Sequence, residues 1–372
     1  MARIAIVLNT SWNIYNFRLP LLDHLRGLGY EILAVAPEDE YSHRIPYPFH
    51  HIPIKSKSLN PVGDLLLFFN LYRVFKKTKP DILLLYTIKP NVYGNLAAHL
   101  LGIKTVSNIA GLGALFINPG RVTKLAKWLY RLAMKVPVKV FFQNNEDMEM
   151  FIKEGLVSKD IAERIPGSGV DLARFHCSSD IVKKEGKFVF LLLSRMLWDK
   201  GVREYVEAAR LLLRKRTDVE FQLLGFLGSD NPQAISKKEM DQLTASEGII
   251  YLGVSDHVEA FIQKADCVVL PSYKEGVPRS LLEAAAMAKP IIATDVTGCR
   301  DVVEDGVNGF LCQPRDSRAL LEKMEKMIGL DGRERTRLGN NGRDKVKKNF
   351  DQNIVIEKYA RTVRDTLVCG KK

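Results

Sequence analysis

The sequence has few cysteines, and their spacing argues against two common kinds of stabilising site. Five cysteines occur in 372 residues, none of them in a C-x-x-C pair, and no histidine stands at a zinc-ligand spacing from any of them. Structural zinc sites and disulfide frameworks both require such paired spacings. We therefore expect no metal site and no disulfide framework, and the cysteines fit a reducing compartment best.

Long apolar runs are also absent. A membrane-spanning helix needs roughly 20 consecutive apolar residues, and no stretch of the chain approaches that length. The amino end, MARIAIVLNT, is typical of a short strand and lacks the basic region and cleavage site of a signal peptide. These absences predict a protein that is cytoplasmic or peripheral to a membrane.

Acidic residues are nearly missing from residues 55–139. Fourteen Lys or Arg stand there against Asp64 and Asp81, so this stretch carries the whole net charge of +12. A one-sided basic field attracts anionic lipid headgroups or nucleic acid. Within residues 121–139, basic and apolar residues each recur at intervals of three and four, which predicts an amphipathic helix.

We interpret this helix as one that lies at a membrane surface, because Trp128 and the basic side chains suit the headgroup boundary. The alternatives are an ordinary surface helix with a solvated basic face, or a nucleic-acid site, for which no recognisable motif is present. The expected partner is thus a membrane surface, through the basic residues 121–139, and no nucleic acid.

Short apolar runs alternate with helical patterns along the whole chain. The first half has strand-like runs at 3–8, 31–37, 81–86, 103–109 and 138–143, and the second half at 187–194, 219–225, 248–253, 267–272, 290–295 and 309–314. This alternation predicts two doubly wound, Rossmann-like parallel sheets of α/β class that face each other across a cleft. Pro166, Gly167 and Gly169 form a turn-rich joint, which divides the chain into domains 1–172 and 173–352.

Two glutamates eight positions apart, Glu275 and Glu283, follow the expected strand 267–272. Gly276 permits close backbone approach, and the helix expected to begin next offers free N–H groups that can bind a phosphate. Glu283, one turn into that helix, could accept hydrogen bonds from vicinal hydroxyls such as those of a ribose. Two acids at this spacing also occur by chance, so the spacing alone leaves open a glutamate that only solvates its helix.

A second charged pair follows the expected strand 187–194. Arg195 comes directly after the strand, and Lys200 stands five residues later, before Gly201. Such a pair can hold a diphosphate and neutralise the charge that grows on it as a glycosidic bond breaks, without a metal. The alternative is an ordinary exposed pair of basic residues in a loop.

Together these residues resemble the carboxy-terminal domain of the family-four glycosyltransferases. The similarity covers most of residues 165–368, in stretches that include LLLSRMLWDKGV, YLGVSD, ADCVVLPSYKEG and TDVTGCRDVVEDGVNGFLCQP. It implies the GT-B fold, retention of anomeric configuration, and a UDP-sugar co-substrate with neither metal nor cofactor. It also implies catalytic roles for Arg195 and Lys200 on the diphosphate and for Glu275 on the donor sugar, with Glu283 on the ribose. The further donor-binding residues it implies are Gly276, Val277, Pro278 and Val254.

The amino-terminal half resembles a narrower group, the bacterial enzymes of capsule, O-antigen and protein N-glycosylation assembly, undecaprenyl-diphosphate-sugar N-acetylgalactosaminyltransferases among them. The similar stretches are NIYNFRLPLL, PEDEYS, KSLNPVGDL, TIKPNVYGNLAA and NIAGLGALF. This resemblance implies a polyprenyl-diphosphate-linked acceptor at the inner membrane face, with Arg18 and Lys89 as candidate ligands of its phosphates. The chain lacks the Gly-Gly pair of many relatives in the first loop and their His after the fourth strand.

The resulting expectation is a retaining glycosyltransferase that moves an N-acetylhexosamine, GalNAc or GlcNAc, from a UDP-sugar to a saccharide on undecaprenyl diphosphate. The first domain would bind the acceptor and the membrane, with a carboxy-terminal helix (353–368) packed back on it, and the second would bind the donor. The alternatives are a different donor sugar, a UDP-sugar 2-epimerase of the same architecture, and a non-catalytic membrane scaffold. An epimerase needs no lipid surface, and a scaffold need not keep the four charged residues.

Overall fold

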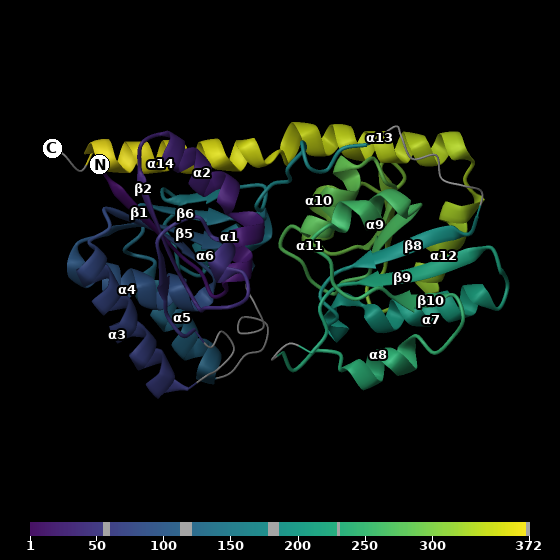
Figure 1. The fold of residues 1–372 in the computed structure, drawn as a ribbon, viewed down its shortest axis with the longest axis horizontal. Helices are drawn as coiled ribbons and strands as arrows, with labels where there is room; N and C mark the ends of the chain where they lie inside the picture. Colours follow the sequence, from purple (N-terminus) through teal and green to yellow (C-terminus); the bar gives the residue numbers. More distant parts are fainter. Residues whose placement is uncertain (55–59, 112–120, 178–185, 229–230, 370–372) are drawn as a thin grey trace. The chain divides into compact units, whose positions relative to one another are not determined.

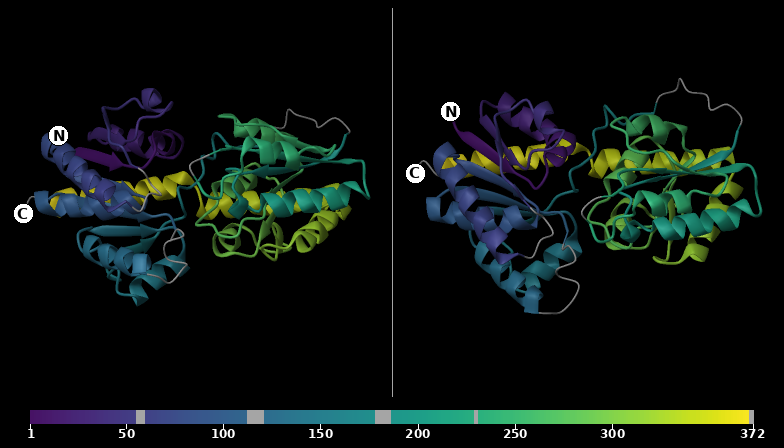
Figure 2. Two further views of the ribbon diagram at one scale, coloured as in Figure 1. Left: turned by 90° about the horizontal axis from the view of Figure 1, so that it is seen from below. Right: turned by 60° about the horizontal axis from the view of Figure 1, so that its bottom comes forward.

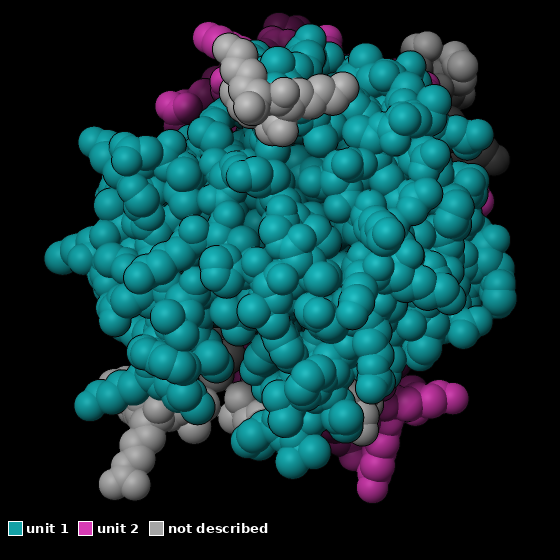
Figure 3. Space-filling view, turned by 90° about the vertical axis from the view of Figure 1, so that its left-hand side faces the viewer, with its two compact units in different colours: residues 1–168, 353–372 teal, residues 169–352 magenta. Residues whose placement is uncertain are grey.

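The structure is a computed structural model that describes residues 1–54, 60–111, 121–177, 186–228 and 231–369. It divides into two compact units, and Figure 3 colours them separately. Unit 1 comprises Met1–Ser168 together with Asn353–Lys372, and unit 2 comprises Gly169–Gln352. Parts of KSLNPVGDL and NIAGLGALF, and the side chain of Arg121, lie outside the described residues.

Seven parallel strands form the sheet in the described part of unit 1, in the order β3-β2-β1-β4-β5-β6-β7. They are β1 (Arg3–Val7), β2 (Glu31–Ala36), β3 (Phe49–His51), β4 (Ile82–Tyr86), β5 (Lys104–Ile109), β6 (Lys139–Phe142) and β7 (Ala162–Arg164). In β4 all five residues of ILLLY are buried, as expected for a parallel strand covered on both faces. The carboxyl ends of β1, β4 and β5 therefore meet at one edge of this sheet.

Helices cover both faces of this sheet (Figures 1 and 2). One face packs against α1 (Ser11–Phe17), α2 (Leu19–Gly27) and α14 (Gln352–Cys369), and the other against α3 (Pro61–Thr78) and α4 (Asn95–Leu101). A separate apolar cluster joins β6 to α5 (Arg121–Ala133) and α6 (Asn145–Lys153). The connections also contain a 3₁₀ turn, η1 (Ser42–Arg44), and a π-helical turn, η2 (Pro90–Gly94).

The carboxy-terminal helix α14 is part of the core of unit 1. Tyr359 is fully buried, its ring lies 4.7 Å from that of Phe141, and its hydroxyl accepts a hydrogen bond from Asn108 Nδ2 at 3.0 Å. Because Asn108 lies near the end of β5, the helix contributes a buried polar group close to the carboxyl edge of the sheet.

Six parallel strands form the sheet in the described part of unit 2, in the order β10-β9-β8-β11-β12-β13. They are β8 (Phe188–Leu193), β9 (Val219–Leu224), β10 (Ile249–Tyr251), β11 (Cys267–Leu270), β12 (Ile291–Thr294) and β13 (Gly309–Cys312). The helical elements are η4 (Trp198–Lys200), α7 (Val202–Leu213), α8 (Lys237–Leu243), α9 (Val258–Lys264), α10 (Arg279–Ala286), α11 (Thr297–Val302), α12 (Ser317–Gly329) and α13 (Gly332–Asn349). One apolar cluster lies on each face of this sheet.

The predicted fold class, two doubly wound parallel sheets, is confirmed. All eleven expected strands are present, and unit 1 adds β3 and β7, which are three residues long and partly polar. Two short helices, α1 and α2, precede β2, because the chain leaves helical geometry at Arg18 (φ −123°, ψ −14°) before Pro20. The amphipathic helix expected within residues 121–139 is α5, but it is shorter than its spacing predicts. It ends at Ala133, ahead of Pro137, and Lys139 begins β6.

Candidate active site

Lys200 and Glu275 form an ion pair at the carboxyl edge of the sheet of unit 2. The Lys200 Nζ lies 2.5 Å from Glu275 Oε1, and the two side chains are only 15 % and 13 % exposed. Lys200 belongs to the loop after β8, and Glu275 to the loop after β11, which is the neighbouring strand. The carboxylate thus holds an ammonium group at the edge where parallel α/β sheets bind ligands.

Glycine allows these two loops to touch. Gly201 has φ +73°, and a Cβ atom there would lie 2.0 Å from the carbonyl oxygen of Pro271. The loops are also joined by a backbone hydrogen bond, in which Tyr273 N–H donates to the carbonyl of Asp199 at 2.9 Å. The backbone contact is therefore what brings Lys200 to Glu275.

Arg195 lies in the same loop as Lys200 but is exposed. Its guanidinium has no hydrogen-bond or ion-pair partner among the described residues, so the charge is available to a ligand. The loop also packs directly on the backbone that follows β9. A Cβ on Gly225 (φ +148°) would lie 1.7 Å from Ser194 O, so only glycine allows this close approach. Gly225 N–H also donates to Gly253 O at 2.8 Å, and the next residue, Val254, is 47 % exposed.

The segment Gly276–Pro278 leads from Glu275 into α10. A Cβ on Gly298, in α11, would lie 1.8 Å from Gly276 O, so α11 packs directly on this segment. Val277 is half-buried and Pro278, the residue before α10, is buried and makes no side-chain capping bond. The first turn of α10 therefore offers backbone N–H groups of the kind that bind phosphate at helix N-termini.

Glu283 is buried within α10 and is paired with Arg279 one turn earlier. Arg279 Nε donates to Glu283 Oε1 at 2.9 Å, and the side chains are 17 % and 10 % exposed. Burial raises the pKa of Glu283 above its usual value, while the charge and hydrogen bond of Arg279 oppose the rise. Arg279 thus favours a charged carboxylate in a place that would otherwise favour the neutral acid.

Sequence reasoning missed two residues that organise this site. Arg279 stands four positions before Glu283 on one helix face, and that i, i+4 spacing of opposite charges was a usable signal. Tyr273 had no such signal. Its hydroxyl donates to Glu204 Oε1 at 2.6 Å and the guanidinium of Arg315 lies 4.7 Å from its ring centre, so it anchors the loop that carries Glu275.

In unit 1, Arg18 lies at the break between α1 and α2. It is 6 % exposed, and its guanidinium lies 4.3 Å from the ring centre of Tyr86, the last residue of β4. Its Nε has no hydrogen-bond partner, and no carboxylate pairs with it among the described residues. A buried cation without a counter-charge is costly, and a bound anion would relieve that cost.

Lys89 has a different environment. Its Nζ lies 2.5 Å from Asp64 Oδ1, and Asp64 Oδ2 also accepts a hydrogen bond from the Tyr93 hydroxyl at 2.9 Å. The lysine is 10 % exposed. It therefore joins the loop after β4 to α3, and its charge is already shared with a carboxylate.

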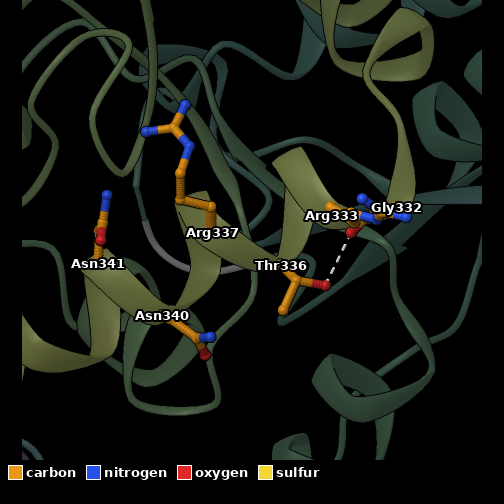
Figure 4. Close-up of a pocket in the computed structure, with 6 residues that line it drawn as sticks. All are labelled: Gly332, Arg333, Thr336, Arg337, Asn340 and Asn341. Atoms are coloured by element: carbon orange, nitrogen blue, oxygen red, sulfur yellow. Dashed lines mark hydrogen bonds between the residues drawn. The ribbon is translucent and has the colours of Figure 1, made fainter.

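The described residues contain no cluster of three or more side chains suited to holding a metal ion. Within the same ranges, no helix is long and apolar enough to cross a bilayer. A shallow cavity of about 570 Å³ lies on α13, and Figure 4 shows the residues that line it, among them Arg333, Arg337 and Asn341. All of its lining residues come from that helix and none follows a strand, so this cavity is separate from the candidate site.

Comparison with known families and proteins gives matches over nearly the whole chain. Residues 177–345 match the family model described as glycosyl transferases group 1, and residues 3–144 match the model described as glycosyl transferase 4-like. A *Campylobacter jejuni* protein, N,N'-diacetylbacillosaminyl-diphospho-undecaprenol alpha-1,3-N-acetylgalactosaminyltransferase, is 30 % identical over 96 % of this chain and 97 % of its own. An *Escherichia coli* UDP-Gal:alpha-D-GlcNAc-diphosphoundecaprenol alpha-1,3-galactosyltransferase is 25 % identical over 81 % and 79 %.

Solved structures share the fold. *Anabaena* HepE in complex with UDP and glucose superposes with a TM-score of 0.80 at 18 % identity, covering 98 % of this chain and 100 % of that one. Sucrose-phosphate synthase from *Thermosynechococcus elongatus* gives a TM-score of 0.80 at 17 % identity, covering 99 % and 100 %.

Proposed function

Because this chain belongs to the group 1 glycosyl transferases, we propose that it transfers an N-acetylhexosamine from a UDP-sugar to a saccharide on undecaprenyl diphosphate. The family is the retaining, metal-independent class with the GT-B fold, and its named relatives act in bacterial glycan assembly. The main support for the proposal is the Lys200–Glu275 ion pair at the carboxyl edge of one sheet, in the same loop region as Arg195, which has no partner among the described residues.

The donor would bind along this edge. Arg195 and Lys200 would bind the diphosphate, and Glu283 would accept hydrogen bonds from the ribose hydroxyls. Glu275 would hold Lys200 in place and orient the hydroxyls of the donor sugar. The backbone of Gly276, Val277 and Pro278, together with Val254, would line the remainder of the nucleotide-sugar site.

The reaction then needs only charge stabilisation and proton transfer. The acceptor oxygen attacks the anomeric carbon on the face from which UDP departs, while the bond from that carbon to the phosphate oxygen breaks. The two cations neutralise the developing negative charge, and the departing phosphate oxygen takes the acceptor's proton. This scheme retains the anomeric configuration, as the family does.

Unit 1 would bind the acceptor. The buried Arg18, which lacks a carboxylate partner among the described residues, fits an acceptor phosphate, and Lys89 would add a second cation that it shares with Asp64. The basic residues 121–139 would hold the protein peripherally at the inner face of the cell membrane, where such an acceptor is anchored.

Sugar transfer tests this proposal. A panel of UDP-sugars, each with a synthetic polyprenyl-diphosphate saccharide, should give one preferred N-acetylhexosamine donor, at a rate that EDTA leaves unchanged. The named galactosyltransferase relative makes UDP-galactose the essential competing donor. Preference for UDP-galactose would replace the donor in the proposal, and restoration of an EDTA-sensitive rate by magnesium would contradict the metal-free mechanism.

A further inference from the structure

Exposed apolar side chains are concentrated on two helices of unit 1. On α3 they are Val62, Leu65, Leu66 and Phe69, between 47 % and 65 % exposed. On α5 they are Leu125, Trp128 and Leu132, between 38 % and 57 % exposed. Exposed apolar residues that cluster in this way usually mark a surface that another body covers.

The four residues of α3 form one stripe. Their positions, 62, 65, 66 and 69, have the i, i+3, i+4, i+7 spacing of a single helix face. The core side of the helix is a different stripe, formed by the buried Leu67, Leu71 and Phe75. Packing within unit 1 therefore explains one apolar face of α3 and leaves the other in solvent.

The exposed face of α3 becomes basic toward the end of the helix. Arg73, Lys76 and Lys77 are exposed and continue the stripe beyond Phe69. The helix has one acidic residue, Asp64, and its carboxylate is occupied by Lys89 and Tyr93. An apolar segment followed by a purely basic one matches the acyl boundary and the anionic headgroups of a bilayer.

The helix α5 repeats this combination. Its exposed apolar residues lie among the exposed Lys124 and Arg131, and Lys135 follows shortly after the helix ends. Both α3 and α5 pack against η2, so they flank the same turn. Both also begin at the carboxyl edge of the sheet, because each follows a parallel strand of unit 1.

We infer that the exposed faces of α3 and α5 together form a surface that binds an anionic lipid bilayer, with the apolar half of α3 entering the headgroup–acyl boundary. This deepens the proposed function, on which it rests for the biological role of a membrane. The inference adds α3 to the membrane-binding surface, which the sequence pattern of residues 121–139 alone does not predict. A nucleic-acid partner would leave the Leu and Phe side chains in water, and a second copy of the chain would leave the exposed basic residues without an anionic partner.

Vesicle flotation with the full-length chain tests this surface. Vesicles of phosphatidylcholine with phosphatidylglycerol should carry the protein upward, and vesicles of phosphatidylcholine alone should carry much less. The triple variant L65Q/L66Q/F69Q should lower partitioning by about tenfold or more, because the lost apolar burial supplies much of the binding. The matched control is L100Q on α4, which removes an apolar residue that is 64 % exposed but outside both stripes, and it should bind as the wild type does.

UDP affinity, measured by titration, shows whether a variant that has lost vesicle binding is still folded, since the proposed donor site lies in unit 2. A triple variant that binds UDP normally but has lost the vesicles supports the inference. Equal flotation of the triple variant and L100Q overturns the inference. A wild-type dimer that the triple substitution makes monomeric also overturns it, because the stripe on α3 would then be a protein interface. Vesicle binding without sugar transfer from any UDP-sugar would count against the proposed function alone, whereas transfer to a short water-soluble acceptor without vesicle binding would count against this inference alone.

Discussion

Three of the four charged residues of the candidate donor site are held by an opposite charge. Glu275 holds Lys200, and Arg279 holds Glu283, while Arg195 is exposed and unpaired among the described residues. Side chains fixed before the ligand arrives need little reorganisation during reaction, which is what electrostatic catalysis requires. Substitution at these positions and in unit 1 distinguishes residues that act on ligands from residues that support the fold.

Removal of Arg195 should affect activity and leave stability unchanged. Arg195→Ala should lower kcat/KM by about 10²–10³-fold, and its free energy of unfolding should stay within about 0.5 kcal/mol of the wild type because the side chain is exposed. The control is Lys215→Met, which breaks the exposed pair with Glu325 in the same unit and should leave activity unchanged. Steady-state kinetics and urea unfolding give both quantities, and near-normal turnover of Arg195→Ala would remove it from the site.

As the pH is lowered, donor affinity should begin to fall at a higher pH than the titration of an ordinary glutamate would cause. Burial holds the pKa of Glu283 above its usual value, so the carboxylate is lost as the pH falls through that raised pKa, and the ribose hydroxyls lose their acceptor. Arg279→Gln removes the charge that opposes the rise, so the decline should move to higher pH. Titration calorimetry with UDP at a series of pH values measures the pH at which the affinity declines.

The control for this pH dependence is Glu283→Gln, which cannot titrate and should give weak but pH-independent UDP binding. Adding Arg279→Gln to Glu283→Gln should have no further effect on the pH profile. If Arg279→Gln weakens UDP binding equally at every pH, or does so in the Glu283→Gln background as well, Arg279 acts by another route.

Arg18→Met and Lys89→Met should differ in their effect on stability. Arg18→Met removes a buried cation that has no carboxylate partner among the described residues, so stability should change by less than about 1 kcal/mol while the KM for the acceptor rises. Lys89→Met leaves Asp64 without its cation and should destabilise the fold by about 1–3 kcal/mol. Unfolding curves measure the change in stability, and acceptor-saturation curves measure the KM. A strongly destabilised Arg18→Met variant with a normal KM would show that Arg18 supports the fold and does not bind the acceptor.

At the scale of elements, the site depends on contacts between loops that follow neighbouring strands. Gly201, Gly225 and Gly298 each lie where a Cβ would meet a backbone oxygen of another loop within 2.0 Å. The three contacts join the loops after β8, β9 and β11 and the start of α11. The loops can therefore keep Lys200 and Glu275 together without a ligand.

Gly201→Ala should consequently disable the site through its geometry. The added methyl group meets Pro271 O and the residue has φ +73°, so we expect a loss of about 2–4 kcal/mol in stability and a large loss of turnover. Gly228→Ala is the matched control, because Gly228 also has positive φ, +62°, but nothing within 4 Å of its Cβ position, and only strain of about 1 kcal/mol should follow. Equal effects of the two substitutions would mean that the contact with Pro271 is unimportant.

Much of the element pattern could be predicted from the sequence, and the exceptions have physical reasons. The eleven predicted strands are apolar runs buried by helices, whereas β3 (FHH) and β7 (AER) are three-residue edge strands whose pairing depends on their neighbours. The helix break at Arg18 was not predicted, although Pro20, in the first turn of α2, was a usable signal. The pairing of Lys200 with Glu275, 75 positions apart, could not be predicted, because it depends on which strands become adjacent and which glycine lets their loops meet.

At the scale of the whole molecule, two units with separate cores divide the proposed tasks between them. The charged residues of the candidate donor site lie in unit 2, while Arg18, Lys89 and the exposed faces of α3 and α5 lie in unit 1. Similarity to the *C. jejuni* enzyme extends over 96 % of the chain and so includes both units. A single chain would thus combine a nucleotide-sugar site with an acceptor site suited to a lipid-anchored diphosphate.

The proposed function is tested by assaying sugar transfer from UDP-GalNAc and UDP-GlcNAc to a polyprenyl-diphosphate saccharide and determining the anomeric configuration of the product by NMR. We expect transfer from one of these donors, an α-linked product from the α-linked donor, and loss of the reaction in Arg195→Ala. A β-linked product, or no transfer from any UDP-sugar by a protein that is folded and bound to vesicles, would contradict it.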